Sequence, residues 1–298
     1  MCGTDAHVLA IARMNELDRA RQARLRRRFD RAAACYDQFA GIQREITLRL
    51  LERLDLVQVD PGWVLDLGAG TGDGTAQLGR RYPQAKIIAV DFSYAMLRQG
   101  QKLGSAGNLV AADMFQLPFA SGVIDLVFSS STLQWCAPLA DVLQEIGRVL
   151  HPGGLLMFST YGPDTLRELQ AAQRAAGVEG GVNEFSDMHP IGDLLLEEGY
   201  QDPVLDVERL DASYASVRDL VCELKGIGSG RMEPLATQSC TRQQWQALTE
   251  AYPTDDQGRV HATYEAIFGH ALAPVSRTRG ETATIPVSAI GHGSGGRT

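Results

Sequence analysis

The chain has 298 residues, of which 44% are hydrophobic, and a formal net charge of −8 at pH 7. This length suits one large α/β domain better than two equal ones. The negative charge argues against a protein whose main partner is a nucleic-acid backbone, because such binding neutralises phosphates. No apolar run approaches the roughly 20 residues that cross a bilayer and no signal-peptide core is evident, so we expect a cytoplasmic protein without a membrane partner.

Charge is spread unevenly along the sequence. Eight arginines but only three acidic residues fall between Arg13 and Arg31, along one predicted helix. This pattern fits either a solvated helix face or an electrostatic dock for an acidic protein or a nucleic acid. The five cysteines include no Cys-x-x-Cys pair, so we expect free thiols and no metal site. Residues 275–298 are rich in Gly, Thr and Ser, which predicts a disordered tail.

The most informative segment is a buried-strand pattern, Val64–Leu67, that runs into closely spaced glycines ending at Gly72. Such glycines allow a sharp turn and let a cofactor lie against backbone N–H groups at a helix start. Asp91 ends the next apolar run, where a carboxylate can accept both hydroxyls of a ribose. The third glycine comes one residue too early for a dinucleotide fingerprint. Asp66 would repel a diphosphate but suits the ammonium of a methionine moiety.

Further strand ends follow in order. Asp113 lies near the end of the run 108–114, where its carboxylate can hydrogen-bond an adenine amino group. The buried run 123–130 is followed by Gln134 and Trp135. The run 146–154, which contains a His-Pro-Gly-Gly segment, is expected to end a helix, with Pro152 stopping it. A fifth strand is expected from residue 155.

In this order the features resemble the class I S-adenosylmethionine-dependent methyltransferases. The resemblance implies S-adenosylmethionine as cofactor, S-adenosylhomocysteine as product and no metal. It implies an α/β fold of the Rossmann-like type: a seven-stranded, mostly parallel sheet with helices on both faces, a reversed strand near the edge and a helical lid. The expected cofactor-binding residues are Asp66, Gly68, Ala69, Gly70, Asp91, Phe92, Asp113, Met114, Ser129 and Gln134.

The remaining elements are placed by periodicity. Late strands are expected over 202–214 and 261–270, and helices over 215–226 and 241–252, the second opening at Thr241 as an N-cap. We expect residues 1–274 to form one methyltransferase domain. Its parts are basic and lid helices over about 10–55, a cofactor-binding core over about 56–160, and lid plus C-terminal strands over about 161–274.

Three segments outside the core bear on the acceptor: the run 29–37, Gly-Pro-Asp-Thr-Leu at 162–166, and Asp-Met-His at 187–189. Together they resemble the malonyl-[acyl-carrier protein] O-methyltransferase family of biotin synthesis. Pro190 departs from the second Asp expected there, and residues 226–238 match poorly. The resemblance implies methyl transfer to the free carboxylate of a malonyl thioester, on carrier protein or coenzyme A. That carboxylate is ionised at neutral pH, so no general base is required.

Substrate-site candidates follow from this resemblance. Tyr36 is expected to touch the methionine carboxylate or the substrate from a lid helix. Trp135 is expected either to line the pocket or to lie in the core. Arg167 is expected one turn into a helix, either pairing with the malonyl carboxylate or facing solvent beside Asp164. All three would position rather than transfer protons. His189 suits a structural or a catalytic role.

A carrier protein is the expected partner. Because carrier proteins of this type are acidic, the cluster from Arg19 to Arg31 is a candidate dock. Alternatives remain open: a class I methyltransferase for another carboxylate or for a protein, or a non-catalytic S-adenosylmethionine-binding assembly factor. Nucleic-acid methylation ranks last, because the chain lacks an Asn-Pro-Pro-Tyr-like motif for a flipped base.

Overall fold

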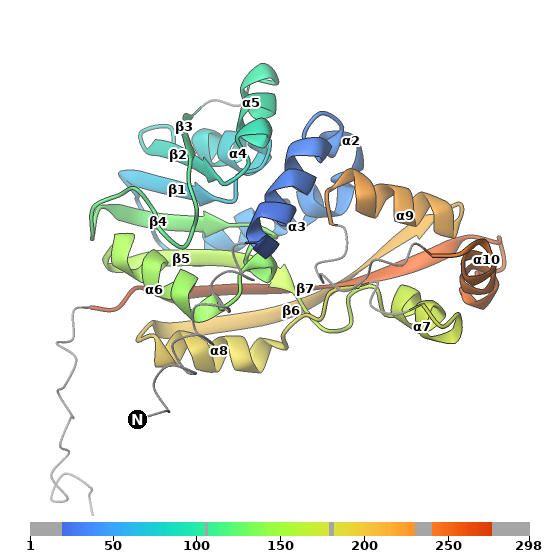
Figure 1. The fold of residues 1–298 in the computed structure, drawn as a ribbon. Coiled ribbons are helices and arrows are strands. Elements are labelled where there is room, and N and C mark those ends of the chain that lie inside the picture. The colour runs from blue at the N-terminus through green and yellow to red at the C-terminus, as the bar shows by residue number, and fades with distance from the viewer. Residues whose placement is uncertain (1–19, 105–106, 179–181, 230–239, 276–298) are drawn as a thin grey trace, which may run out of the picture.

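A computed structural model describes residues 20–104, 107–178, 182–229 and 240–275. Seven strands form one sheet in the order β3-β2-β1-β4-β5-β7-β6 (Figure 1). The first five strands are parallel, whereas β7 is antiparallel to both β5 and β6. The mostly parallel sheet with a reversed strand beside the edge is therefore confirmed. The strands are β1 (Trp63–Leu67), β2 (Lys86–Asp91), β3 (Asn108–Ala111), β4 (Ile124–Ser129), β5 (Leu150–Tyr161), β6 (Gln201–Tyr214) and β7 (Val260–Leu272).

Helices cover both faces of the sheet, as expected. One buried cluster contains Leu50 of α3 and Leu78 of α4, and the other contains Ile146 of α6 and Leu195 of α8. Alternation along β1 sends Val64 to the first cluster and Leu65 to the second. Besides the helical residues 20–32, the helices are α2 (Tyr36–Phe39), α3 (Gly41–Arg53), α4 (Asp73–Arg81), α5 (Tyr94–Lys102), α6 (Leu139–Val149), α7 (Arg167–Ala175), α8 (Met188–Glu197), α9 (Val217–Gly226) and α10 (Arg242–Ala251), with 3₁₀ turns η1 (Leu54–Leu56) and η2 (Leu133–Trp135).

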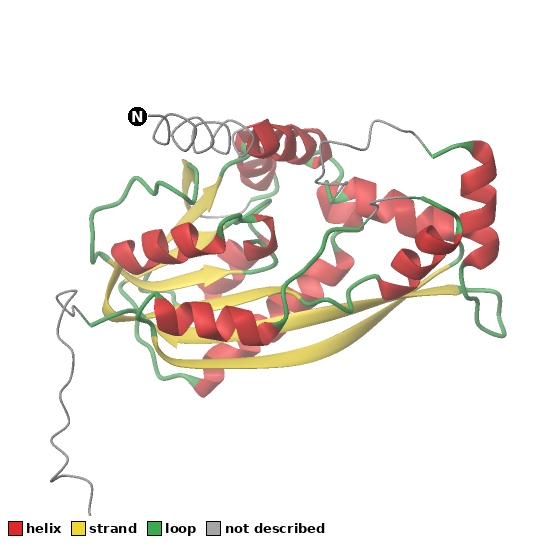
Figure 2. Ribbon diagram, turned by 60° about the horizontal axis from the view of Figure 1, so that its bottom comes forward, coloured by secondary structure: helices red, strands yellow, loops and turns green. Residues whose placement is uncertain are grey.

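The two longest strands carry the helices beside the site. β5 pairs with β7 only from Ala266 to Leu272, whereas β6 pairs with β7 back to Val260. The β6–β7 ribbon therefore extends beyond the other strands, toward α7, α9 and α10 (Figures 1 and 2).

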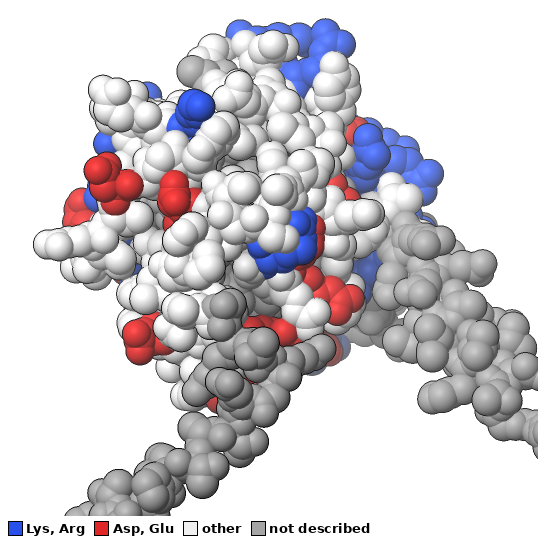
Figure 3. All heavy atoms as spheres, turned by 90° about the vertical axis from the view of Figure 1, so that its left-hand side faces the viewer, with Lys and Arg blue, Asp and Glu red and all other residues white. Residues whose placement is uncertain are grey.

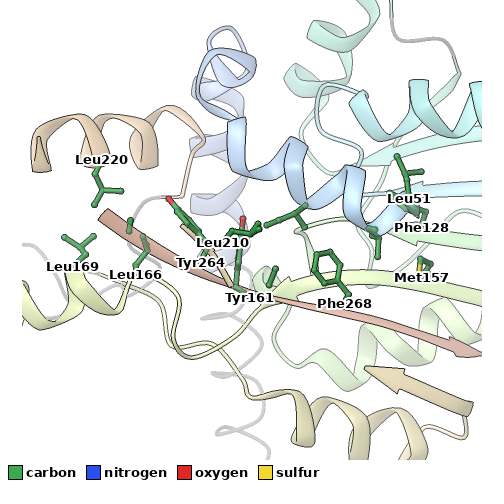
Figure 4. Close-up of a cluster of buried hydrophobic side chains, with 14 of the residues drawn as sticks. Leu51, Phe128, Met157, Tyr161, Leu166, Leu169, Leu210, Leu220, Tyr264 and Phe268 are labelled. Atoms are coloured by element: carbon green, nitrogen blue, oxygen red, sulfur yellow. The ribbon is translucent and has the colours of Figure 1, made fainter. Parts of the chain in front are cut away.

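The first hydrophobic cluster joins the sheet core to this extension. Figure 4 shows its side chains running from Phe128 and Met157 in the sheet to Leu169 of α7 and Leu220 of α9, with Tyr161 between. Apolar area buried along one continuous cluster holds the helices of the extension against the ribbon.

α3 is also fixed to the edge strand by charge. Arg49 and Arg53 form ion pairs with Asp206 and Glu208 of β6, and the Arg53 guanidinium lies 3.7 Å from the centre of the Phe268 ring. Cation–π contact and paired carboxylates favour one position of α3 on the sheet.

The late elements lie where periodicity placed them. The expected strands correspond to β6 and β7, and the expected helices to α9 and α10. The Thr241 hydroxyl caps α10 by accepting from the backbone N–H of Gln244, and the Gln244 side-chain oxygen accepts in turn from the backbone N–H of Thr241. This capping box satisfies two backbone groups at the helix start.

Two element boundaries were predicted wrongly. β5 begins at Leu150 rather than at residue 155, so Pro152 lies within the strand and α6 ends earlier, at Val149. A Cβ at Gly154 would lie 3.1 Å from the Asp125 carbonyl oxygen, so this glycine lets the extended chain pass close to β4. The helix after Gly162 begins only at Arg167, because Leu166 adopts a left-handed conformation with φ of 58°.

Several expectations fall partly outside the described residues. These are the basic segment before residue 20 and nearly all of the 275–298 tail. Within the described ranges, no helix is long and apolar enough to cross a membrane. The same ranges hold no cluster of three or more His, Cys, Asp or Glu side chains arranged to bind a metal ion.

Candidate functional site

The glycine-rich turn after β1 joins the ends of two parallel strands. Gly68 has φ of 78°, and a Cβ there would overlap the Thr132 side chain. Gly70 has φ of 57°, and its N–H donates to Asp91 Oδ2 over 2.9 Å. Positive φ and close approach both require glycine here. The turn therefore brings backbone amides beside the carboxylate that ends β2.

A first pocket, the nucleoside pocket, opens at this edge of the sheet. Two carboxylates, Asp91 and Asp113, face it together with apolar and aromatic side chains. The Phe29 ring lies edge-on to Phe92 and to Trp135, with centroids 5.7 Å apart in each pair. Carboxylates that accept hydroxyl and amino hydrogens, within an aromatic enclosure, suit a ribose and an adenine. The pocket also includes Tyr36, Gly68, Gly70, Met96, Met114, Ser130, Ser131 and Thr132.

A second pocket, the methionine pocket, lies on the other side of the glycine turn. Arg44 is the one Lys or Arg among the described residues that line the pockets of this site, and its Nη1 donates to the Asp37 carbonyl over 2.7 Å. The Thr71 hydroxyl donates to Asp37 Oδ1 over 2.6 Å. Asp66 also lines this pocket. The Arg44 cation and the buried Asp66 in one small pocket match the carboxylate and the ammonium of an amino acid.

Burial changes the acidity of the two strand-end aspartates. It raises the pKa of Asp66 to about 7, although the Thr75 hydroxyl donates to Asp66 Oδ2 over 2.5 Å and opposes the shift. It raises the pKa of Asp91 to about 6, against hydrogen bonds from the N–H groups of Ser93 and Gly70. A ligand that donates hydrogen bonds or carries positive charge would favour the ionised form of each.

A third pocket, the acceptor pocket, lies between α3, η2, the end of β5, β7 and α9. Gln43 Nε2 donates to the Tyr161 hydroxyl over 3.1 Å. Gln43 Oε1 and Gln134 Oε1 are buried without a protein partner. The wall is otherwise largely aromatic and apolar; it includes Phe29, Trp135, Leu166, Val182, Phe185, Leu224, Ile227 and Tyr264. Buried polar atoms normally have a hydrogen-bond partner, so two buried amide oxygens without one are typical of a site whose ligand supplies the missing hydrogen bonds.

Two residues lie where the three pockets meet. Tyr36 and Ser131 line all three, and Gln43 lines both the methionine and the acceptor pockets. A group at this junction is accessible from the nucleoside, methionine and acceptor sides at once. The arrangement can therefore present one ligand's reactive atom to another in a confined, mostly apolar space.

The structure brings most of the expected site residues together. Eleven of them line the nucleoside, methionine or acceptor pockets: Tyr36, Asp66, Gly68, Ala69, Gly70, Asp91, Phe92, Asp113, Met114, Gln134 and Trp135. Gln134, expected to bind the cofactor, lines the acceptor pocket and neither of the other two. Trp135, for which a core position was the alternative, lines both the nucleoside and acceptor pockets.

Three expected residues lie elsewhere. Ser129 is fully buried and its hydroxyl donates to the Leu67 carbonyl over 3.0 Å, which joins β4 to β1. Arg167 has a 55% exposed side chain paired with Glu168 at 3.1 Å and Asp164 at 3.8 Å. This is the solvent-facing arrangement, because the late start of α7 leaves Arg167 outside the acceptor pocket. His189 is exposed, and its Nδ1 lies 2.6 Å from Asp187 Oδ1.

The sequence reasoning assigned no role to several pocket residues. Tyr161 ends β5 at the same edge as Asp91, so the rule that ligands bind at the carboxyl ends of parallel strands would have found it. Ser131 follows β4 with φ of 50°, which the sequence does not signal. Tyr264 comes from the extended part of β7, whose position depends on the antiparallel pairing.

Comparison with known proteins defines the class. Residues 65–158 match the family described as "Methyltransferase domain". A putative methyltransferase from Bacillus halodurans superposes with a TM-score of 0.54 at 17% identity, covering 76% of this chain and 98% of that one. The YcgJ protein of Bacillus subtilis gives 0.53 at 13% identity, covering 76% and 97%. The fold and the site together define a class I methyltransferase.

Sequence relatives narrow the assignment within that class. Proteins named malonyl-[acyl-carrier protein] O-methyltransferase are 45% identical in Methylovorus sp., over 86% of this chain and 90% of the relative, and 45% identical in Laribacter hongkongensis, over 87% and 91%. The Gallionella capsiferriformans relative is 40% identical over 91% and 97%. The chain belongs to the malonyl-[acyl-carrier protein] O-methyltransferase family.

Proposed function

We propose that the protein transfers a methyl group from S-adenosylmethionine to the free carboxylate of a malonyl thioester. The product is the malonyl methyl ester that, in the family's role, starts biotin synthesis. The observation that carries the proposal is the junction at Tyr36 and Ser131, where the acceptor pocket meets the nucleoside and methionine pockets. Family membership supplies the identity of the acceptor.

The residues present fit the cofactor. Asp91 and Asp113 would accept the ribose hydroxyls and the adenine amino group, while Asp66 and Arg44 would face the ammonium and the carboxylate of the methionine moiety. No protein atom lies within 4 Å of the position that a Cβ of Gly70 would occupy, so the space beside this glycine is open to the cofactor. When bound, S-adenosylmethionine supplies an electrophilic methyl group on a positively charged sulfur.

The reaction requires the protein to position the acceptor carboxylate against the methyl group, and it requires no acid or base. A carboxylate oxygen of the acceptor bonds to the methyl carbon while the methyl–sulfur bond breaks, and that electron pair stays on sulfur to give the neutral thioether of S-adenosylhomocysteine. No proton moves, because the carboxylate is already ionised near neutral pH. The aromatic wall around Tyr36, Phe29 and Trp135 excludes water from the nucleophile and fixes its direction.

We further infer that an acyl-carrier protein docks on the basic helical segment. Arg24, Arg26 and Arg27 are exposed within residues 20–32, and Leu25 of the same segment lines the nucleoside pocket. A partner on this helix would therefore lie beside the site. On the face in Figure 3, the larger blue areas lie at the top and at the right-hand edge, where one borders grey atoms, whereas the acidic groups form small separate patches. Arg19, the first residue of the proposed dock, lies outside the described residues.

An acceptor profile tests the proposed reaction. Transfer of labelled methyl from S-adenosylmethionine would be compared for malonyl, succinyl and glutaryl thioesters, for free malonate and for a bulk protein acceptor. We expect the malonyl thioester to have the highest kcat/KM and to yield a base-labile ester. Preference for another carboxylate or for protein would contradict the malonyl assignment, and no transfer to any acceptor despite cofactor binding would favour the non-catalytic alternative.

A further inference from the structure

We infer that the acceptor carboxylate is bound by a neutral hydrogen-bond donor, the Gln43 amide held in place by the Tyr161 hydroxyl, rather than by a cation. The inference rests on the proposed methyl transfer and names the residues that recognise the acceptor's charged end.

The pair lies where the nucleophile has to be. Gln43 lines both the methionine and acceptor pockets, so it stands next to the junction at which the methyl group would be presented. Tyr161 is 7% exposed and its ring lies 5.6 Å from Phe185 and 6.2 Å from Tyr264. A hydrogen bond of 3.1 Å joins the Gln43 amide to the Tyr161 hydroxyl. These packed rings hold the hydroxyl at one place on the acceptor side.

The free hydrogen-bonding capacity of this pair matches an anion. An ionised carboxylate accepts hydrogen bonds and donates none. The amide group of Gln43 can be flipped so that its oxygen and nitrogen exchange places. The oxygen, which is otherwise buried without a partner, then accepts the hydrogen of the Tyr161 hydroxyl. Both amide N–H bonds then remain to donate, and at least one is directed away from Tyr161. Gln43 would thus satisfy its orphaned oxygen and hold the carboxylate at once.

Charge considerations favour neutral donors here. Methyl transfer from a sulfonium to a carboxylate removes both charges, so an adjacent fixed cation would stabilise the separated charges of the reactants more than the transition state. It would also repel the sulfonium. Among the described residues lining the acceptor pocket none is Lys or Arg, and Arg167 pairs with Asp164 and Glu168 outside it. Neutral donors bind the carboxylate without this cost.

The near-isosteric variant Gln43→Glu tests the inference, because it replaces an amide donor by a like charge. We expect the dissociation constant of malonyl-coenzyme A, measured calorimetrically with S-adenosylhomocysteine present, to rise about tenfold or more, since a bond to a charged group is lost and repulsion is added. Affinity for S-adenosylmethionine should not fall, because the new carboxylate would stand beside its positive charges. A folding defect would instead weaken both.

Gln101→Glu is the matched control, since Gln101 is exposed on α5 and lines none of the three pockets. It should bind both ligands like the unmodified protein. Tyr161→Phe is the second variant and should weaken malonyl-coenzyme A binding about threefold to tenfold, with cofactor affinity unchanged.

Two failures are distinguishable. If the unmodified protein transfers methyl groups to the malonyl thioester while Gln43→Glu and Tyr161→Phe bind malonyl-coenzyme A within twofold of Gln101→Glu, recognition by this pair is wrong and the proposed function stands. If the unmodified protein transfers no methyl group to a malonyl thioester, the proposed function itself fails.

Discussion

Buried acids at strand ends are the main chemical feature at the scale of single residues. Asp66 and Asp91 come from the paired strands β1 and β2, and both lie below a tenth exposed. Burial makes the ionised form of each carboxylate unfavourable in the ligand-free protein, and this desolvation raises the pKa of both residues. A ligand that offers hydroxyl or ammonium hydrogens relieves that cost, so cofactor affinity and the ionisation of these acids are linked.

The first prediction concerns Asp91 and pH. Its pKa of about 6 means that the ligand-free carboxyl takes up a proton as pH falls through 6, whereas ribose hydroxyls need the ionised form. The contribution of Asp91 to the affinity for S-adenosylhomocysteine should therefore be full above pH 7 and fall through pH 6, which lowers the affinity about tenfold at pH 5 from this group alone. Calorimetry of Asp91→Asn should show weaker binding whose ratio between pH 5 and pH 7.5 is about tenfold smaller.

The titration of Asp91 does not unfold the ligand-free protein at low pH, so acid unfolding through this group cannot account for the predicted loss of S-adenosylhomocysteine affinity. The folded-state pKa lies above the ordinary value of 3.8, so the folded protein binds this proton more tightly than the unfolded chain does. Between these two pKa values the group therefore stabilises the ligand-free fold as pH falls. An Asp91→Asn variant with the full pH dependence of the unmodified protein would contradict the assignment.

The second prediction separates two arginines. Arg167→Ala should leave kcat/KM within about twofold and change the free energy of unfolding by less than about 1 kcal/mol, because exposed ion pairs contribute little. Arg44→Ala should weaken S-adenosylmethionine binding about tenfold, since a charge-assisted pair with the methionine carboxylate would be lost. Steady-state kinetics and calorimetry on both variants check this. A tenfold loss of activity in a correctly folded Arg167→Ala protein would restore that residue to the acceptor site.

At the scale of elements, the position of α9 on α2 shapes the acceptor pocket. A Cβ at Gly226 would overlap the Phe39 ring, so the two helices pack closely only because this residue is glycine. Leu224 and Ile227, on either side of Gly226, line the acceptor pocket. A displaced α9 would therefore alter the acceptor side while leaving the nucleoside pocket in place.

The third prediction follows from that contact. Gly226→Ala should lower the free energy of unfolding by about 1–3 kcal/mol through overpacking, and should raise KM for the malonyl thioester while the cofactor dissociation constant stays within about twofold. Gly79→Ala is the control, because Gly79 lies in α4 with open space around it. That change should be neutral or stabilise by up to about 1 kcal/mol. Equal effects of the two variants in denaturation and kinetics would argue against the α2–α9 contact.

Strand-end chemistry was predictable from sequence because it depends on local patterns. The apolar runs that end in Asp91 and Asp113 predict two strands, and the aspartates mark the edge of the sheet at which a ligand binds. The Gln43–Tyr161 contact was not predictable, since it joins α3 to β5 across 118 positions of sequence. Arg167 was misplaced because the left-handed Leu166 delays α7, and no local residue type signals that conformation. Local patterns thus locate the cofactor side, and the acceptor side depends on tertiary packing.

At the scale of the whole molecule, an acidic chain presents a basic segment near its site. A net charge of −8 would repel an acidic carrier protein unless approach occurs at the exposed arginines of residues 20–32. The organisation of residues 1–274 as one domain and a cytoplasmic location stay predictions.

The fourth prediction tests docking by charge reversal. Replacing Arg24, Arg26 and Arg27 with Glu should raise KM for malonyl-acyl-carrier protein and spare malonyl-coenzyme A, because only the carrier protein would use the dock. The matched control replaces three exposed arginines outside the segment, Arg80, Arg98 and Arg174, with Glu. Equal losses on both substrates, or an equal effect of the control, would count against docking at this helix.

The most direct test of the central claim is mass spectrometry of malonyl-acyl-carrier protein after incubation with the purified protein and S-adenosylmethionine. The account predicts a rapid gain of one methyl group on the malonyl moiety, removed by mild saponification and absent without cofactor. An unchanged malonyl moiety, with cofactor binding confirmed in the same preparation, would contradict it.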